Sequence, residues 1–267
     1  MPFPASRRVV FRKNPLDQVI CQLRFPTILE IGSQQPAAFQ KRIRHEYPFY
    51  EKDESDNVIQ QVLPKEMADL ISKLPLSLGQ QSGHAAHKFK TAEDTRLITL
   101  TTDSIAVSEK KYTRWEQFHP EVLRAQEALE EEYHPAFYTR VGLRYQDVID
   151  QSSLGVQEPW NRLINPVMIG ILGSEELQGE LTEIRTAALI RVDGVRGGNV
   201  RLVHGLAKQR SSGLVVYVID ADFYTETRCG RDDIVGILDT FRTAAGNLFR
   251  WAATDRLREI LEPVPIA

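Results

Sequence analysis

The chain has 267 residues, of which 42% are hydrophobic and 26% charged, an ordinary globular composition that allows a substantial core. Its formal net charge of −3 excludes a strongly basic protein that binds nucleic acid through overall charge, although a local basic face is still compatible with it. The start of the chain lacks the apolar segment of a signal peptide and no stretch is long and apolar enough to span a membrane, so we expect a cytoplasmic protein without membrane contact.

The first regular element that the sequence predicts is a strand over residues 18–25, which read QVICQLRF. Alternation places Cys21, Leu23 and Phe25 on one face and Gln22 and Arg24 on the other. A helix is expected over residues 36–47, because Pro36 suits a first turn and apolar residues then recur every four positions.

A helix, a hairpin and a long helix are predicted for the remainder of the first half. The helix covers residues 64–76, the hairpin covers 88–110, and the long helix covers 112–135. Pro120 conflicts with an unbroken long helix, since a proline removes a backbone hydrogen bond inside it. We therefore expect either a kink at this proline or a main helical body that begins at His119.

The second half is predicted to contain a strand over residues 137–150, a short helix over 158–172 that Pro166 interrupts, and a long amphipathic helix over 231–262. Three further strands are expected between these helices, because apolar runs there are separated by glycine-containing turns. These strands cover residues 183–193, 199–208 and 213–224.

Both halves follow the same order of elements, which indicates an internal duplication. A Leu-Arg-aromatic string at 23–25 recurs at 143–145, an offset of about 120 residues. An apolar strand that closes at Asp103 has a counterpart that closes at Asp220, an offset of about 117 residues. Chance is the alternative, because the string is short and common.

The duplication predicts an α+β fold of two tandem pseudo-symmetric units, each an antiparallel sheet packed on a long helix. Helix-grip and TBP-like arrangements both fit this pattern, and the sequence does not choose between them. The two units are expected to pack together as one compact body, a β-α-β-β-α unit over residues 1–135 and a β-α-β-β-β-α unit over residues 136–267.

Two carboxylates near the end of the last predicted strand form a candidate metal site. Asp220 and Asp222 are two positions apart and therefore lie on the same side of the strand, and spaced carboxylates are typical ligands of divalent cations. Glu226 is a candidate third ligand, and the alternative is a solvated strand end or an aspartate that caps a helix. His84 and His87 have the spacing H-x-x-H, but we expect them in a surface loop. No cofactor is predicted.

Arginines on the polar sides of the predicted strands form a candidate binding surface. Arg24 and Arg144 become a pair under the duplication, and Arg201 is a candidate neighbour on the same groove side. Such arginines bind phosphate, nucleic acid or a carboxylate of a partner. The alternative is an ion pair within the sheet, with Asp147 or Glu30 as the acceptor.

Other candidate residues lie in the second half. His204 is either a hydrogen-bonded core histidine or a ligand contact in the groove. Arg250 and Trp251 lie on the last long helix, where the tryptophan is either an anchor for a protein partner or a cover for the sheet edge. Cys21 and Cys229 lack metal-binding spacing and are expected to be free thiols.

Distinctive strings in the same order along nearly the whole chain resemble one protein family. They include PFPASRRVVFRKNPLDQVICQLRFPTIL, FYTRVGLRYQDVID, RLVHGL, VYVIDADFY and FRTAAGNLFRWAATDRLREILEPVP. The chain resembles a sporadically distributed family of bacterial proteins of similar length. The resemblance does not indicate an enzymatic activity, and it assigns no catalytic residues to this chain. The patchy distribution of the family implies an association with defence or toxin–antitoxin loci.

Three functional hypotheses follow from the sequence. The first is a non-catalytic binding or regulatory protein that acts with a protein partner encoded beside it, or that holds a small ligand. The second is a metal-dependent enzyme such as a nuclease, centred on Asp220 and Asp222. The third is nucleic-acid binding through Arg24, Arg144 and Arg201. The oligomeric state is left open.

Overall fold

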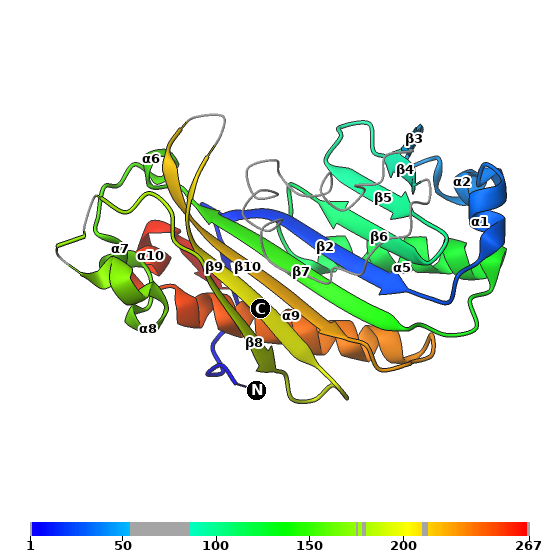
Figure 1. The fold of residues 1–267 in the computed structure, drawn as a ribbon. Coiled ribbons are helices and arrows are strands. Elements are labelled where there is room, and N and C mark those ends of the chain that lie inside the picture. The colour runs from blue at the N-terminus through cyan, green and yellow to red at the C-terminus, as the bar shows by residue number, and fades with distance from the viewer. Residues whose placement is uncertain (1, 54–85, 175, 178–179, 210–212, 266–267) are drawn as a thin grey trace.

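The computed structural model describes residues 2–53, 86–174, 176–177, 180–209 and 213–265. It confirms an α+β protein with a large antiparallel sheet (Figure 1). Nine strands of the described residues form this sheet, in the spatial order β3 (Phe49–Asp53), β4 (Ala86–Lys90), β5 (Arg96–Leu100), β6 (Ser104–Glu109), β2 (Leu16–Arg24), β7 (Arg140–Ile149), β10 (Val215–Thr225), β9 (Asn199–Lys208) and β8 (Thr186–Arg191).

Two long helices, α5 (Trp115–Tyr133) and α9 (Asp233–Ala252), cover the same face of the sheet (Figure 1). Helix α5 packs against β6, and α9 packs against β7 and β10. None of the helices in the described part of the chain is long and apolar enough to cross a membrane. The shorter helical elements are α1 (Leu29–Ser33), α2 (Ala37–Ile43), α6 (Gln151–Leu154), α7 (Trp160–Leu163), α8 (Pro166–Ile169), the 3₁₀ turn η1 (Gly170–Gly173) and α10 (Asp255–Ile260).

A separate two-stranded sheet joins the beginning and the end of the described chain. Strand β1 (Val9–Phe11) pairs antiparallel with β11 (Pro263–Pro265). Two further backbone hydrogen bonds continue this contact, from Arg12 N to the carbonyl of Glu262 and from Lys13 N to the carbonyl of Leu261, each 3.1 Å long. The N-terminal segment is therefore fixed beside α9 and α10.

The two repeated strings lie next to each other at the centre of the large sheet. Strands β2 and β7 pair antiparallel, with Gln22 opposite Gly142. The apolar residues of both strands, such as Cys21 and Leu143, are buried in the core beneath the helices. Each fully buried aliphatic side chain contributes about 1.5–3 kcal/mol to stability. Because side chains alternate along a strand, the polar residues occupy the opposite face of the sheet, which we call the polar face.

Helix α5 begins at Trp115 and continues through Pro120, so of the two expected alternatives the one in which the main body begins at His119 was wrong. The first turn is held by contacts that offset the hydrogen bond lost at the proline. Trp115 is buried and donates from Nε1 to Asp239 on α9 at 3.0 Å, and Arg8 donates to Glu116 at 2.8 Å. Tertiary contacts, which the local pattern does not reveal, thus extend the helix at its N-terminus.

The predicted hairpin over 88–110 is a three-stranded element, because β6 follows β5 after the tight turn at Thr101–Asp103. Thr101 closes that turn with a side-chain hydrogen bond of 2.9 Å to Asp103. Edge strand β3 was not predicted, since its two adjacent aromatic residues are followed by three charged ones and no apolar alternation results. The first half therefore contributes more strands than expected.

Two predicted helices were too long. The helix expected over 36–47 ends at Ile43 as α2, although Tyr47 still packs in the core. The helix expected over 231–262 divides into α9 and α10, because Ala253 is extended and forms a β-bridge with Ile164. Thr254 then caps α10 through a 3.2 Å hydrogen bond from Leu257 N to its hydroxyl oxygen. The helix predicted over 64–76 and His84 lie outside the described residues. His87 was also expected in a surface loop, and this prediction was wrong, because His87 is buried in β4 with its Nε2 3.0 Å from the carbonyl oxygen of Ile31.

Candidate functional site

The two candidate metal ligands lie on the polar face beside two arginines of β7. Arg144 donates through Nε and Nη2 to the two carboxylate oxygens of Asp220, at 2.7 and 2.5 Å. Arg140 donates through Nη2 to both oxygens of Asp222, at 3.0 and 2.8 Å. Each carboxylate is therefore neutralised by a guanidinium group. In the described residues, no group of three or more potential metal ligands occurs.

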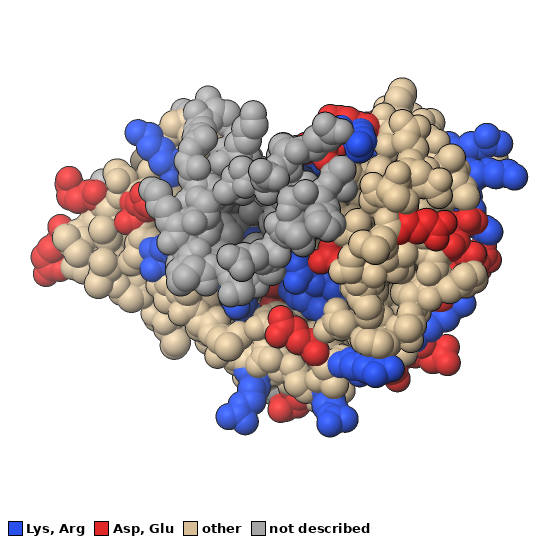
Figure 2. Space-filling model, turned by 45° about the vertical axis from the view of Figure 1, so that its right-hand side comes forward, with Lys and Arg blue, Asp and Glu red and all other residues tan. Residues whose placement is uncertain are grey.

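The three candidate arginines lie on the polar face, but they are not equivalent. Arg144 is committed to Asp220, an acceptor different from the two that the sequence suggested. Arg24 lies opposite Arg140 in the sheet, and its buried Nε has no hydrogen-bond partner among the described residues. Arg201 lies on β9, on the other side of β10 from Arg144. On the face that Figure 2 shows, basic and acidic side chains are both scattered over the described surface.

His204 and Trp251 occupy packed positions. His204 is buried on the helix-covered face, where its Nδ1 lies 2.8 Å from the hydroxyl of Tyr217, and burial lowers its pKa. The imidazole is therefore neutral at physiological pH. Trp251 packs against Phe3 with ring centroids 5.4 Å apart, so it covers the N-terminal segment. Cys21 and Cys229 are free thiols.

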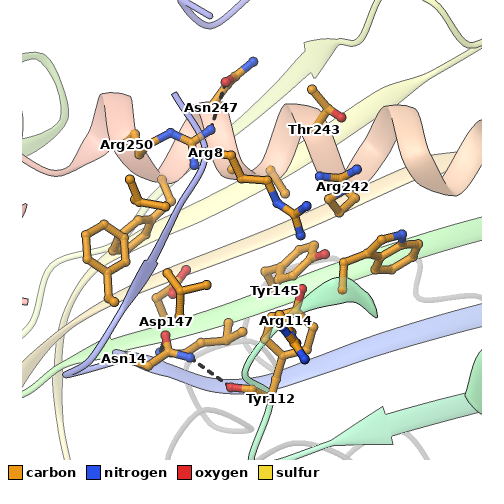
Figure 3. A pocket seen from close by; sticks show the side chains of 18 of the residues that line it. Arg8, Asn14, Tyr112, Arg114, Tyr145, Asp147, Arg242, Thr243, Asn247 and Arg250 are labelled. Carbon is orange, nitrogen blue, oxygen red and sulfur yellow. Dashed lines mark hydrogen bonds between the residues drawn. The ribbon is translucent and has the colours of Figure 1, made fainter. Parts of the chain in front are cut away.

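A cavity of about 200 Å³ lies between the N-terminal segment and the two long helices (Figure 3). Residues 6–16 form one wall, residues 112–115 a second wall, and residues 242–250 of α9 a third. Tyr145 and Asp147 of β7 contribute from the helix-covered face of the sheet. Four segments that are far apart in the sequence thus meet around one space.

The N-terminal wall of this cavity is fixed by polar contacts on both sides. Ser6 donates from its backbone N and its hydroxyl to Asn247 Oδ1 on α9, at 3.3 and 3.2 Å. Asn14 donates from its side chain to the carbonyl of Tyr112 at 2.9 Å. Together with the pairing of β1 and β11, these contacts hold the cavity in a preformed state.

Arginines of the N-terminal segment and of α9 face the cavity with different degrees of neutralisation (Figure 3). Arg8 forms an ion pair with Glu116 at 2.7 Å. Arg250 donates to neutral groups, the hydroxyl of Ser6 and the side-chain oxygen of Asn247. Burial lowers the pKa of Arg250. The positive charges of Arg258, Arg8 and Arg242 lower this pKa further.

Arg242 has no ion pair or side-chain hydrogen bond to the described residues, and its Nε is buried without a partner. Buried polar groups in native proteins usually find an acceptor, because an unpaired one costs about 1–3 kcal/mol. The wall formed by α9 therefore carries positive charge and unused donor capacity.

Asp147 is the acidic residue of the cavity lining in the described chain. Burial, assisted by the negative charge of Asp220, raises its pKa to about 8. The carboxyl group is thus mostly protonated at neutral pH and can donate a hydrogen bond. Burial also raises the pKa of Tyr112 to about 12, so the phenol at the edge of the cavity keeps its proton.

The remainder of the lining is apolar. Phe11 and Phe249 meet edge to face with ring centroids 5.6 Å apart. Leu16 and Ala245 contribute aliphatic surface beside them. The cavity therefore combines an apolar portion with a positively charged portion, which is the usual composition of a small-molecule site.

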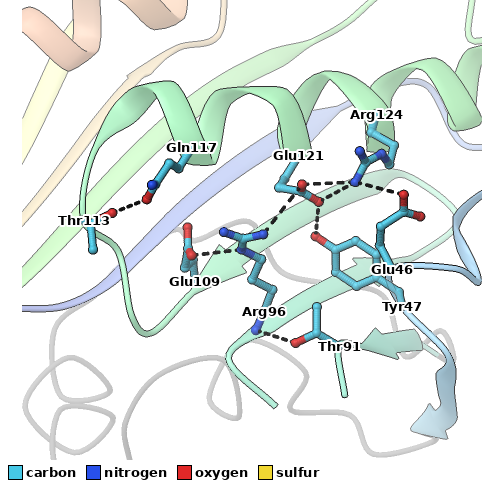
Figure 4. Close-up of polar contacts among 9 residues, drawn as sticks. All are labelled: Glu46, Tyr47, Thr91, Arg96, Glu109, Thr113, Gln117, Glu121 and Arg124. Carbon is cyan, nitrogen blue, oxygen red and sulfur yellow. Dashed lines mark hydrogen bonds and ion pairs between the residues drawn. The ribbon is translucent and has the colours of Figure 1, made fainter. Parts of the chain in front are cut away.

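A second cluster of partly buried charges, between α5 and the first half of the sheet, is fully paired (Figure 4). Glu121 accepts a 3.0 Å hydrogen bond from Tyr47 and two from Arg124, and Arg96 lies 3.6 Å away. Arg96 also donates to Glu109 at 2.9 Å. Each charged group of this cluster has an ion-pair partner of opposite sign among the described residues, so the cluster ties α5 to the sheet.

No protein-family model matches this sequence, and the curated proteins contain no significant match to it.

Sequence reasoning identified Arg250 but not the cavity around it. Arg8, Arg242 and Asp147 join it only through tertiary packing of the N-terminal segment, α9 and β7. One signal was present in the sequence: Arg242, Gly246 and Arg250 are spaced four apart and therefore lie on one face of the helix.

Proposed function

We propose that this chain is a non-catalytic binding protein that holds a small ligand in the cavity beneath its N-terminal segment and acts through a protein partner. The observation that carries the proposal is the preformed cavity with two uncompensated arginines, Arg242 and Arg250. Its volume of about 200 Å³ is comparable with an engineered cavity of about 150 Å³ that binds benzene.

The chemistry of the lining supports binding rather than catalysis. The described residues around the cavity include no histidine, cysteine or lysine that could activate a nucleophile. The hydroxyl of Ser6 donates to Asn247, and that of Thr243 donates to the backbone carbonyl of Asp239 at 2.8 Å. Both hydroxyls are thus engaged with neutral acceptors and not with a base, so the side chains are arranged to position a molecule.

Titration of the full chain with two small aromatic probes, benzoate and benzyl alcohol, tests this proposal. The indole N–H signal of Trp115, which lines the cavity, should shift on binding, whereas that of Trp160 should not. Ala245→Phe should abolish the shift, because the larger side chain occupies the cavity. The proposal fails if neither probe moves the Trp115 signal, or if both bind equally well to the filled variant.

The partner part of the proposal is supported by the family resemblance and by the position of the N-terminal segment. This segment forms a wall of the cavity and also pairs with the exposed strand β11. A partner bound to this two-stranded sheet would therefore lie next to the cavity wall. The proposed partner is the protein encoded by a neighbouring defence or toxin–antitoxin gene, which would bind this surface. Co-expression with the neighbouring gene product should give co-elution, and separate elution would overturn this part.

We also propose that the fold arose by duplication and has a TBP-like arrangement. Gln22 pairs with Gly142, and these residues are separated by the same 120 positions as the repeated strings, as a twofold axis between β2 and β7 requires. The helices α5 and α9 cover one face of a single sheet, which favours this arrangement over a helix grip. Superposition of β2 on β7 in an experimental structure should carry α5 onto α9; a failure to do so would remove this proposal.

A further inference from the structure

Two arginines of α9, Arg242 and Arg250, line the cavity from positions on either side of Gly246 (Figure 3). A Cβ atom at Gly246 would lie 3.0 Å from Nη2 and 3.1 Å from Nη1 of Arg250. The guanidinium group of Arg250 therefore lies along the bare helix surface at Gly246. Arg242 lies one turn earlier on the same face, so the helix presents two guanidinium groups to one space.

These two guanidinium groups lack the counter-ion that Arg8 possesses. Neither Arg242 nor Arg250 has a carboxylate within 4.0 Å among the described residues, whereas Arg8 lies 2.7 Å from Glu116. Concentrating positive charge in a partly buried site is unfavourable unless an anion joins it. A negative group bound between these two arginines would therefore be stabilised by their charge, which in the described residues only Glu116 partly offsets at Arg242.

The apolar part of the cavity indicates the chemistry of the rest of the ligand, to which the negative group is attached. Phe11 and Phe249 form an aromatic corner, with Leu16 beside it. Such a surface favours contact with an apolar ring or a short aliphatic chain rather than with inorganic ions or sugars. The space of about 200 Å³ allows roughly one ring with one head group.

We propose that the cavity binds a small organic anion, a single carboxylate or phosphate head group on an apolar body, with the head group held by Arg242 and Arg250 and the body packed against Phe11 and Phe249. This inference rests on the proposed function, because it names the class of ligand for the same cavity. The guanidinium group of an arginine can donate two parallel N–H hydrogen bonds to either a carboxylate or a phosphate group.

Asp147 makes this binding dependent on pH. While protonated it does not repel the anion and can donate a hydrogen bond to it, whereas above its pKa of about 8 its negative charge opposes the ligand. Affinity should therefore fall as pH rises through this range. The charged and titratable groups that line the cavity together with Asp147 are Arg8, Tyr112, Arg114, Tyr145, Arg242 and Arg250. Asp220 of β10 acts on Asp147 through its negative charge.

Calorimetric titration of the full chain with three probes tests the ligand class. Benzoate, phenyl phosphate and benzyl alcohol share one ring and differ only in the head group. We expect one or both anions to bind at least about tenfold more tightly than the alcohol, and the ratio of the two anions to distinguish a carboxylate from a phosphate ligand.

Two variants and one control complete the experiment. Arg242→Gln and Arg250→Gln should each weaken binding of the preferred anion about tenfold while leaving benzyl alcohol unaffected. Arg44→Gln, an exposed change just after α2 and away from the cavity, should alter neither. Arg242 has no ion pair or side-chain hydrogen bond among the described residues, whereas Arg250 donates to Ser6 and Asn247. Circular dichroism therefore checks that both variants fold, and the unchanged binding of benzyl alcohol checks that the cavity is intact.

The possible outcomes separate this inference from the function on which it rests. Equal binding of all three probes with no effect of the arginine variants would overturn the anion class but keep a ligand cavity. Binding of none of the probes would overturn both. Selective binding of an anion that both arginine variants weaken would support the ligand class.

Discussion

Arg144 of β7 and Asp220 of β10 form a two-pronged ion pair across the centre of the sheet, with N–O distances of 2.7 and 2.5 Å. The side chains are only 9% and 5% exposed. Removing water from both charges is costly, and the two hydrogen bonds offset this cost only while both partners are present. The pair therefore adds little net stability, although the loss of one partner alone would be costly.

Replacing Asp220 by Asn should destabilise the protein by about 3–5 kcal/mol, because Arg144 would remain buried without its counter-charge. Replacing the two partners together, as Arg144→Met with Asp220→Leu, should cost clearly less than the single change. The free energy of unfolding from urea titration measures both. Equal losses in the single and double variants would contradict a desolvated pair.

An exposed ion pair in the same sheet provides the control. Lys90 and Glu51 are 2.7 Å apart, with side chains 35% and 58% exposed. Glu51→Gln should change the free energy of unfolding by less than about 1 kcal/mol, since solvent screens this pair. A loss as large as that of the Asp220 variant would show that depth of burial is not the cause.

This ion pair also marks the boundary of what the sequence predicts. Alternation along 18–25 and 140–145 is a local property, so it correctly predicted both central strands and the polar side of Arg144. The partner of Arg144 depends on the register between β7 and β10, which distant packing sets and which no local pattern contains. For the same reason Asp220 could be read as a metal ligand.

The cavity was harder to predict than the strands. It requires the N-terminal segment to cross α9, and that path depends on the pairing of β1 with β11 near the other end of the chain. Val9–Phe11 and Pro263–Pro265 are too short to show strand periodicity. Arg250 was identified as a candidate, but nothing local connected it with Asp147.

Asp147 should give the protein a measurable dependence of stability on pH. Its folded pKa of about 8 lies above the unfolded value of about 3.9. The stability that it contributes is therefore fully present below about pH 4 and is lost as pH rises through 8. One proton corresponds to at most about 1.4 kcal/mol per pH unit.

The variant Asp147→Asn isolates this effect, because it keeps a neutral polar group and removes the titration. The free energy of unfolding of this variant should increase relative to that of the wild type as pH rises from about 5 to about 8.5. Urea titrations at several pH values measure the difference, in which the contributions of other groups cancel. Parallel curves for the two proteins would rule out a protonated Asp147 in the folded state.

The network in Figure 4 predicts unequal effects for two hydroxyl deletions. Tyr47→Phe removes a buried hydrogen bond to Glu121 and should cost about 1.5–3 kcal/mol, the range for bonds to charged groups. Thr113→Val removes an exposed hydroxyl that contacts Gln117 and should cost less than about 0.5 kcal/mol. Thermal unfolding compares them, and similar losses would show that the cluster does not tie α5 to the sheet.

Two glycines of α9 offer a matched test of the space around Arg250. A glycine inside a helix ordinarily costs about 1 kcal/mol relative to alanine. A Cβ atom at Gly236 would meet no atom within 4 Å, so Gly236→Ala should raise stability by up to about 1 kcal/mol and leave ligand affinity unchanged.

Gly246→Ala should gain less stability, because its methyl group displaces the guanidinium of Arg250. It should also weaken binding of benzoate or phenyl phosphate several-fold although no charge is removed. Unfolding and calorimetric titrations of both variants measure this, and equal affinities would mean that the position of Arg250 beside Gly246 does not matter for the anion.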